Sequence, residues 1–143
     1  MSARSNLDEI MRNLEPQLKG PSFVFCSIPA GEVVDLSDLT PLATFVEDEG
    51  MSLILREADA TKAGLETDGT FRCITLQVHS SLESVGLTAT VSSALAREGI
   101  SANVVAAAYH DHIFVPASRA QEALGILKGL SSEAMKAAEG SAS

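Results

Sequence analysis

The apolar positions in the first half of the chain alternate between the period of a helix and that of a strand. A first helix is predicted by four residues on one helical face: Leu7, Ile10, Met11 and Leu14. The apolar runs 22–28 and 51–55 predict buried strands. Between them, a second helix is expected to begin at Ser37 and end at Gly50, with one apolar face: Leu39, Leu42, Ala43 and Val46. A short helical turn over 58–63 is expected to follow.

The second half shows a similar rhythm. Residues 71–78 alternate as in a strand, with Ile74, Leu76 and Val78 on one face and Cys73, Thr75 and Gln77 on the other, and helices are expected to cover one side of it. The further expected elements are a helix from Leu87 to Gly99, strands over 100–108 and 112–115, and a helix from Ser118. Residues 131–143 are rich in Ser, Ala and Gly and are expected to form a disordered tail.

A short repeat relates the two halves. Glu49-Gly50-Met51-Ser52 recurs as Glu98-Gly99-Ile100-Ser101, an offset of 49 residues that pairs Leu42 with Val91 and Val46 with Leu95. We therefore expect two related βαβ-type halves, residues 1–66 and 67–130, with antiparallel sheets and helices on one face.

Composition and charge narrow the classes of partner. Of the 143 residues 45% are hydrophobic, so the chain is expected to fold around a core. The net charge of -9 opposes binding to nucleic acid or to an anionic membrane surface. Because we find neither a signal peptide nor an apolar run of about 18 residues, we expect a soluble cytoplasmic protein with Cys26 and Cys73 as free thiols.

The stretch from Ile74 to Val115 resembles the ACT-domain pattern of strand, ligand loop, helix, strand and hairpin. The resemblance rests on Gly86-Leu87, Ala94-Leu95-Ala96 and Glu98-Gly99-Ile100. The blocks VHSSLE, VGLTA and YHDHIFVP are similar to those of small bacterial two-ACT proteins related to aspartokinase regulatory domains. The resemblance covers about residues 5–130 and implies a ferredoxin-like α/β sandwich (an α+β fold), an amino acid as ligand, and a homodimer joined through its sheets.

The same resemblance implies a ligand site in the loop after the strand 71–78. Amides at a helix N-terminus can receive a carboxylate, Glu83 an α-ammonium group, and the serines add hydroxyls. The residues expected at the site are His79, Ser80, Ser81, Glu83, Ser84, Val85, Gly86, Leu87 and Asn103. A capping box formed by Ser80 and Glu83 is an equally weighted alternative. The matching loop of the first half, Pro29 to Leu36, is expected to be an ordinary polar turn.

Other chemistry is less well supported. His110 and His112 would point to one face of a strand, with His79 or Asp111 as a third ligand, but no Cys or Glu pattern accompanies them. The sequence contains no nucleophile elbow and no phosphate-binding loop. We therefore predict an amino-acid-binding regulatory protein that is not an enzyme and needs no metal or other cofactor. A small metal-assisted enzyme and a ligand-free dimerisation scaffold remain the alternatives.

Overall fold

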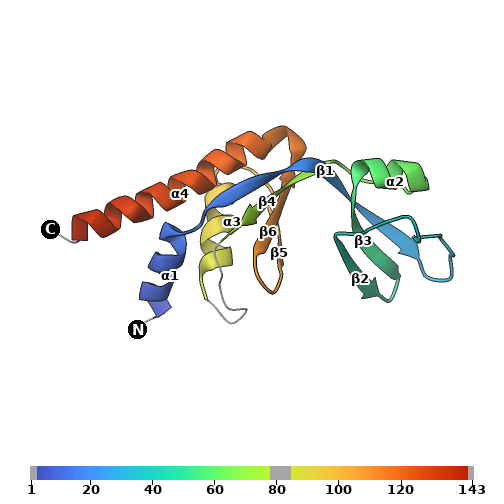
Figure 1. The fold of residues 1–143 in the computed structure, drawn as a ribbon, viewed down its shortest axis with the longest axis horizontal. Coiled ribbons are helices and arrows are strands. Elements are labelled where there is room, and N and C mark those ends of the chain that lie inside the picture. The colour runs from blue at the N-terminus through green and yellow to red at the C-terminus, as the bar shows by residue number, and fades with distance from the viewer. Residues whose placement is uncertain (1–2, 78–84, 142–143) are drawn as a thin grey trace. The chain divides into compact units, whose positions relative to one another are not determined.

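A computed structural model of the chain describes residues 3–77 and 85–141 and shows helices and strands in two compact units (Figure 1). The elements are α1 (Ala3–Arg12), β1 (Pro16–Pro29), β2 (Ala43–Glu47), β3 (Gly50–Arg56), α2 (Glu57–Ala63), β4 (Phe71–Leu76), α3 (Leu87–Arg97), β5 (Asn103–Ala106), β6 (Asp111–Pro116), η1 (Ala117–Arg119) and α4 (Ala120–Ser141). The larger unit contains the residues up to Lys19 and those from Cys73 onward, and the smaller unit contains Gly20–Arg72.

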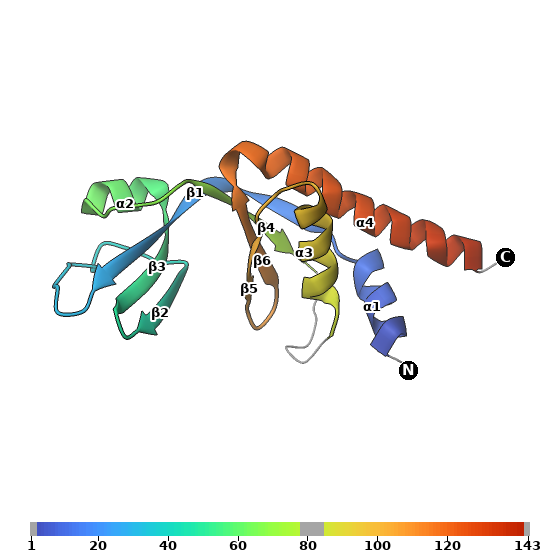
Figure 2. The ribbon, with the colours of Figure 1, turned by 180° about the vertical axis from the view of Figure 1, so that it is seen from behind.

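The larger unit packs α1, α3 and α4 against one face of its strands. In both views of the ribbon, α3 lies between α1 and the strands (Figures 1 and 2). Ile74 and Leu76 of β4, together with Ile113 and Val115 of β6, are buried in the same core as Val91 and Leu95 of α3 and Leu127 of α4. Alternation along the strands turns these residues toward the helices, so this is the face of β4 that the helices cover.

The strand order shows how the larger unit is completed. It runs β1-β4-β6-β5, so the strand beside β4 is the beginning of β1, which comes from the N-terminal part of the chain. The units therefore differ from the expected division into residues 1–66 and 67–130, because residues up to Lys19 pack with the second half. β1 thus contributes residues to both units.

The smaller unit contains the rest of β1 with β2, β3 and α2, and its strand order is β2-β3-β1. The pairing is antiparallel in β1–β3 and in the β2–β3 hairpin. Phe71 at the start of β4 also belongs to this unit, where its ring meets that of Phe25 at 5.1 Å in an edge-to-face contact. The core is small: Val24, Cys26, Ile28, Leu53, Leu55 and Ala60.

The predicted helix from Ser37 to Gly50 is wrong. Residues 43–47 form β2, and the Leu42 N–H extends the ladder by donating to the Ile54 carbonyl at 2.8 Å. Pro41 would remove a donor and create a clash inside such a helix, and Phe45 and Val46 favour a strand. The repeat therefore does not align two helices: Val91 and Leu95 are buried in α3, whereas Val46 is 82% exposed.

The predicted disordered tail is also wrong in its main part, because α4 continues from Ala120 to Ser141. Ser131 lies inside this helix and its Oγ donates to the Arg12 carbonyl at the end of α1, at 3.1 Å. Leu130 and Ala134 are partly buried against the core of the larger unit. Contact with α1 thus supports a helical segment that has little apolar content of its own.

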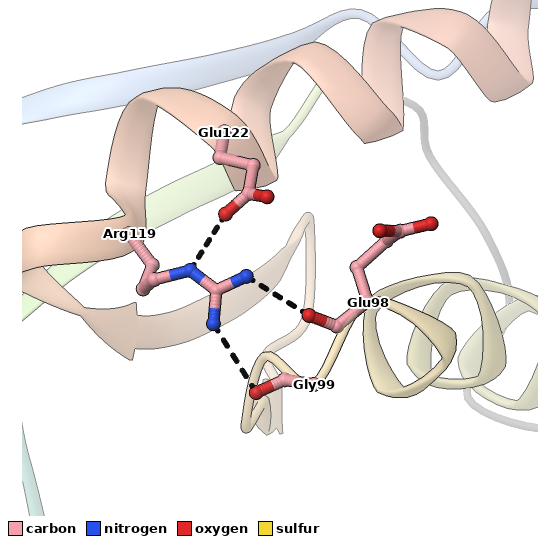
Figure 3. Close-up of polar contacts among 4 residues, drawn as sticks. All are labelled: Glu98, Gly99, Arg119 and Glu122. Carbon is pink, nitrogen blue, oxygen red and sulfur yellow. Dashed lines mark hydrogen bonds and ion pairs between the residues drawn. The ribbon is translucent and has the colours of Figure 1, made fainter.

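Arg119 ties the end of α3 to the start of α4. Its Nη2 donates to the Glu98 carbonyl at 2.9 Å and its Nη1 to the Gly99 carbonyl at 3.4 Å, while its Nε pairs with Glu122 at 2.6 Å (Figure 3). These carbonyls follow the last turn of α3, where acceptors lack partners within the helix and the helix dipole favours a cation. One side chain therefore caps α3 and fixes its end to α4.

Candidate functional site

The sequence-predicted ligand site is described only in part. His79, Ser80, Ser81, Glu83 and Ser84 lie outside the residues that the structure describes. The described members are Val85, Gly86, Leu87 and Asn103. Val85 is exposed, Leu87 is buried in the core at the first position of α3, and Asn103 is exposed at the start of β5. The Leu87 side chain therefore supports the helix, and only its backbone is available to a ligand.

Gly86 is the N-cap of α3 and has a φ of 102°, in the left-handed region that favours glycine. A Cβ at this position would also lie 2.9 Å from Cδ2 of Leu7 in α1. The backbone conformation thus favours glycine, and a larger residue would also have to displace the end of the Leu7 side chain.

The N-terminal end of α3 is neither acidic in its first turn nor capped by a side chain of the described residues. Its first turn contains no acidic residue, and Gly86 has no side chain with which to cap the first amides. These amides carry the positive end of the helix dipole. A carboxylate or another small anion is the complementary ligand.

A second polar cluster lies on the face of β4 and β6 that points away from Ile74 and Ile113. Thr75 is only 2% exposed, and its Oγ1 lies 2.9 Å from Nδ1 of His112. Cys73 Sγ lies 3.7 Å from the same hydroxyl. The alternation of the strand places Cys73 and Thr75 together, but no pattern in the sequence indicates that this second face is also buried.

The environment of this cluster shifts two pKa values. Burial lowers the pKa of His112, the neighbouring charges of His110 and Lys19 lower it further, and Asp111 opposes them. Burial raises the pKa of the Cys73 thiol, partly offset by the Thr75 hydrogen bond and by Lys19. His112 is therefore held neutral and Cys73 protonated, which is the form of an unreactive thiol.

The histidines were the basis of the alternative metal site. The rings of His110 and His112 meet edge to face with centroids 6.5 Å apart, and Nδ1 of His112 is engaged by Thr75. Within residues 3–77 and 85–141, no group of three His, Cys, Asp or Glu side chains is arranged to hold a metal ion. His79, the proposed third ligand, lies outside the described residues.

A pocket of about 560 Å³ lies in the smaller unit, between the loop after β1 and α2. Its lining residues are Asp35, Asp38, Leu39, Asp59, Lys62 and Ala63. Asp35 accepts a hydrogen bond from the Ser37 N–H at 2.9 Å, and hydrogen bonds from the Ser37 side chain and backbone lower the pKa of its carboxyl. The loop expected to be a polar turn therefore borders an acidic hollow.

The outer strand of the smaller unit presents an apolar surface. Phe45 and Val46 of β2 point to opposite faces of the strand and are 72% and 82% exposed, and Leu42 just before them is half-exposed. β2 is paired on one side with β3 and ends the strand order of this unit among the described residues. Its other edge carries backbone groups of the kind that pair with another strand.

Comparisons with known proteins relate both parts of the chain to one family. Models of the ACT domain match residues 2–72 and residues 69–129. No curated protein matches the chain. Within the described residues, none of the helices combines the length and the apolar character needed to cross a membrane.

Solved structures show the same fold. A protein of unknown function from Vibrio cholerae, described as a possible transport protein, is 45% identical over 91% of this chain and 99% of its own, with a TM-score of 0.80. A protein from Agrobacterium tumefaciens is 18% identical over 83% and 90%, with a TM-score of 0.67. The ligand-free regulatory subunit of aspartate kinase from Thermus thermophilus is 11% identical over 82% and 97%, with a TM-score of 0.63. The predicted α+β, ferredoxin-like ACT fold is confirmed.

Proposed function

Because the chain belongs to the ACT-domain family, we propose that it is a regulatory protein that reversibly binds an amino acid at the N-terminal end of α3. The observation that carries this proposal is the first turn of α3 after Gly86, which contains no acidic residue, receives no side-chain cap from the described residues and offers backbone amides to a carboxylate. The fold of an aspartate kinase regulatory subunit supports a regulatory role. The protein catalyses no reaction and uses no metal or other cofactor in this proposal.

Each end of an amino acid has a proposed partner. The carboxylate meets the amides of Leu87 and its successors, and the α-ammonium group meets the carboxylate of Glu83. His79, Ser80, Ser81 and Ser84 supply hydroxyl and imidazole groups, while Val85 and Asn103 border the site. This assignment keeps the expected ligand residues but gives Leu87 a backbone role only, because its side chain is buried.

A thermal-shift screen of the purified protein tests the proposal. The twenty amino acids, common nucleotides and divalent metals are each added to the full chain. A ligand at 100 times its dissociation constant adds about 2.7 kcal/mol to stability, which raises the midpoint by several degrees. We expect one or a few amino acids to do so, and expect Glu83→Ala and Asn103→Ala to abolish the shift.

Asp35→Asn is the matched control, because it removes a carboxylate from the pocket of the smaller unit. It should leave the amino-acid shift unchanged. Loss of the shift in Asp35→Asn but not in Glu83→Ala would move the site to that pocket and contradict the proposal. A rise of the unfolding midpoint with a metal alone would favour the metal-assisted alternative. No change of the midpoint with any added compound would favour a ligand-free scaffold.

The protein is also proposed to act as a cytoplasmic homodimer, joined through the outer edge of β2. Antiparallel pairing of β2 with its copy about Phe45 places Glu47 opposite Ala43 and away from the partner's Glu47. Light scattering of the eluting protein should give twice the chain mass, and Phe45→Lys should give the monomer. Val33→Lys, at a 98% exposed position outside the strands, should remain a dimer.

A further inference from the structure

The backbone is strained at the residue that joins α1 to β1. Glu15 has a φ of 41° and is the one non-glycine residue with a positive φ in the described ranges 3–77 and 85–141. A residue with a Cβ is less stable in this left-handed region than glycine is. The next residue, Pro16, begins β1 and favours an extended backbone at the residue before it. An extended Glu15 would therefore relieve the strain, but it would no longer lead the chain to the present position of α1.

The surface that receives α1 is formed by later parts of the chain. α1 contacts α3 and α4, which both follow Glu15 in the sequence. Its apolar residues pack in the core of the larger unit: Leu7, Ile10, Met11 and Leu14. Two hydrogen bonds complete the docking, from the Ser131 Oγ to the Arg12 carbonyl at 3.1 Å and from the Gln77 N–H to the Leu14 carbonyl at 3.2 Å. A second copy of the chain presents the same surface and the same acceptors and donors.

We propose that α1 exchanges between two copies of the chain, with Glu15 and Pro16 as the hinge. In the exchanged dimer each α1 docks on α3 and α4 of the second copy and keeps all the contacts described above, while Glu15 becomes extended. The dimer relieves two strained hinges, and strain in a short hinge is a recognised cause of such exchange. The opposing term is the association of two chains, so the dimer should increase with protein concentration. The surface under α1 thus has one defined partner, the α1 of a second copy.

The first test fixes the hinge in the open conformation. Every protein is the full chain with Phe45→Lys, so that the β2 edge proposed above does not contribute to dimer formation. Glu15→Pro holds φ near about −65° and excludes the left-handed conformation. Light scattering of the eluting protein should give twice the chain mass with Glu15→Pro, and mainly the mass of one chain without it.

A second measurement shows whether α1 is the exchanged element. Chains with labelled methionine methyl groups are refolded together with unlabelled chains, and isotope-filtered NMR records contacts between the two. The Met11 methyl of a labelled chain should contact protons of the unlabelled chain, because Met11 is buried in the core that the second copy supplies. A monomer with Glu15→Pro, or a dimer without this contact between chains, would overturn the inference. Neither measurement uses a ligand, so the outcome does not depend on amino-acid binding.

Two milder substitutions separate strain from charge and decide the inference even if Glu15→Pro does not fold. Glu15→Gly and Glu15→Ala both remove the carboxylate, but only glycine adopts the positive φ without strain. Sedimentation after refolding at a series of concentrations measures the dimerisation constant. It should be about tenfold lower or more in Glu15→Gly than in Glu15→Ala, because each dimer relieves two hinges. Equal constants, or no dimer of Glu15→Ala at millimolar concentration, would show that the hinge does not drive exchange.

Discussion

The two units share a strand arrangement but differ in the connection after their first strand. In the larger unit β4 leads to α3, which begins at Gly86 and buries Leu87, Val91 and Leu95. In the smaller unit β1 leads to a loop over residues 30–42, which covers its core only with partly buried Val34, Leu36 and Leu39. Replacing a helix with a loop removes the helix N-terminus and its amides. Among the described residues, the smaller unit therefore has, directly after its first strand, no counterpart of the helix N-terminus on which the proposed carboxylate site of the larger unit depends.

Core truncation should have the largest effect and shows whether the two units unfold together. Leu95→Ala in the larger unit and Leu55→Ala in the smaller unit each remove a fully buried side chain. Each should cost about 2–5 kcal/mol of stability, through lost transfer energy and a residual cavity. Urea unfolding followed by circular dichroism measures the cost. Amide hydrogen exchange then compares the two units. If Leu95→Ala leaves the exchange rates in the smaller unit unchanged, the units unfold separately. An equal rise of the exchange rates in both units would show that they unfold as one cooperative unit.

Alanine substitution at one glycine in each unit compares a clash with fixed backbone to a clash with a movable side chain. At Gly50 a Cβ would lie 2.0 Å from the Ile28 carbonyl oxygen, which is fixed in the β1–β3 ladder. At Gly86 it would meet the end of the Leu7 side chain, which can turn away. Both positions have a positive φ, a strain of about 1–3 kcal/mol for alanine. Gly50→Ala should therefore destabilise the protein more than Gly86→Ala does, as measured by chemical unfolding.

Gly64→Ala serves as the reference for both, because its φ is also positive and no atom lies within 4 Å of the added Cβ. It should cost only the conformational strain, about 1–2 kcal/mol. Equal losses at Gly50, Gly86 and Gly64 would mean that neighbours contribute nothing and that Leu7 does not crowd Gly86. A double variant, Gly86→Ala with Leu7→Ala, should be less destabilised than the sum of its parts.

The fold was predictable from the sequence where local signals and burial agree. Gly99 follows the end of a helix in the sequence prediction and in the structure, and the alternation around Ile74 marks a strand in both. The prediction failed at residues 37–50, where the apolar residues have helical spacing but Phe45 and Val46 face outward on an edge strand. Periodicity reports which residues share a face, and it assumes that this face is buried. The division of β1 between the two units depends on strand pairing over a long distance in the sequence, which no local signal indicates.

For the site, the resemblance predicts Gly86 and Leu87 as ligand residues, and the structure places them at the N-cap and the first position of α3. It did not indicate the contact between Leu7 and Gly86, which joins residues far apart in the chain. Thr75 and His112 were missed as a pair for the same reason, since they meet only when β4 and β6 lie side by side. The burial of Thr75, a hydroxyl within an apolar strand, is visible only in the folded protein.

Acidification should weaken the larger unit more than the smaller one. The pKa of His112 is lowered in the folded state by burial, His110 and Lys19, so the unfolded chain binds its proton more readily. Stability should therefore be fully present above the ordinary pKa of 6.5 and fall as the pH drops below it, until the folded pKa is passed. His112→Asn keeps a polar partner for Thr75 but does not titrate, and should flatten the unfolding midpoint between about pH 7.5 and 5.5.

The charged neighbours of His112 require their own control. The pKa of Asp111 is raised, mainly by burial, so its protonation favours the folded state and opposes the effect of His112 as the pH falls. Asp111→Asn should therefore steepen the loss of stability on acidification. If His112→Asn keeps the wild-type pH dependence, another group is responsible, and the larger unit has no special acid sensitivity.

The smallest expected effect concerns the C-terminal caps of α2 and α3. α2 and α3 end with the same backbone bonds: Leu65 N–H donates to the Ala60 carbonyl at 3.0 Å, and Ile100 N–H to that of Leu95 at 3.0 Å. Only α3 has the additional cap from Arg119, which reaches the Glu98 and Gly99 carbonyls. Arg119→Ala should therefore speed exchange of the Ile100 amide and leave that of Leu65 unchanged.

Arg119→Lys should restore part of the protection, since an ammonium group reaches one carbonyl but lacks the planar fork that contacts two. Glu122→Gln should have less effect than either, because its exposed ion pair only orients the guanidinium. Equal exchange of Ile100 in all three variants would mean that the glycine turn alone closes α3, as it closes α2.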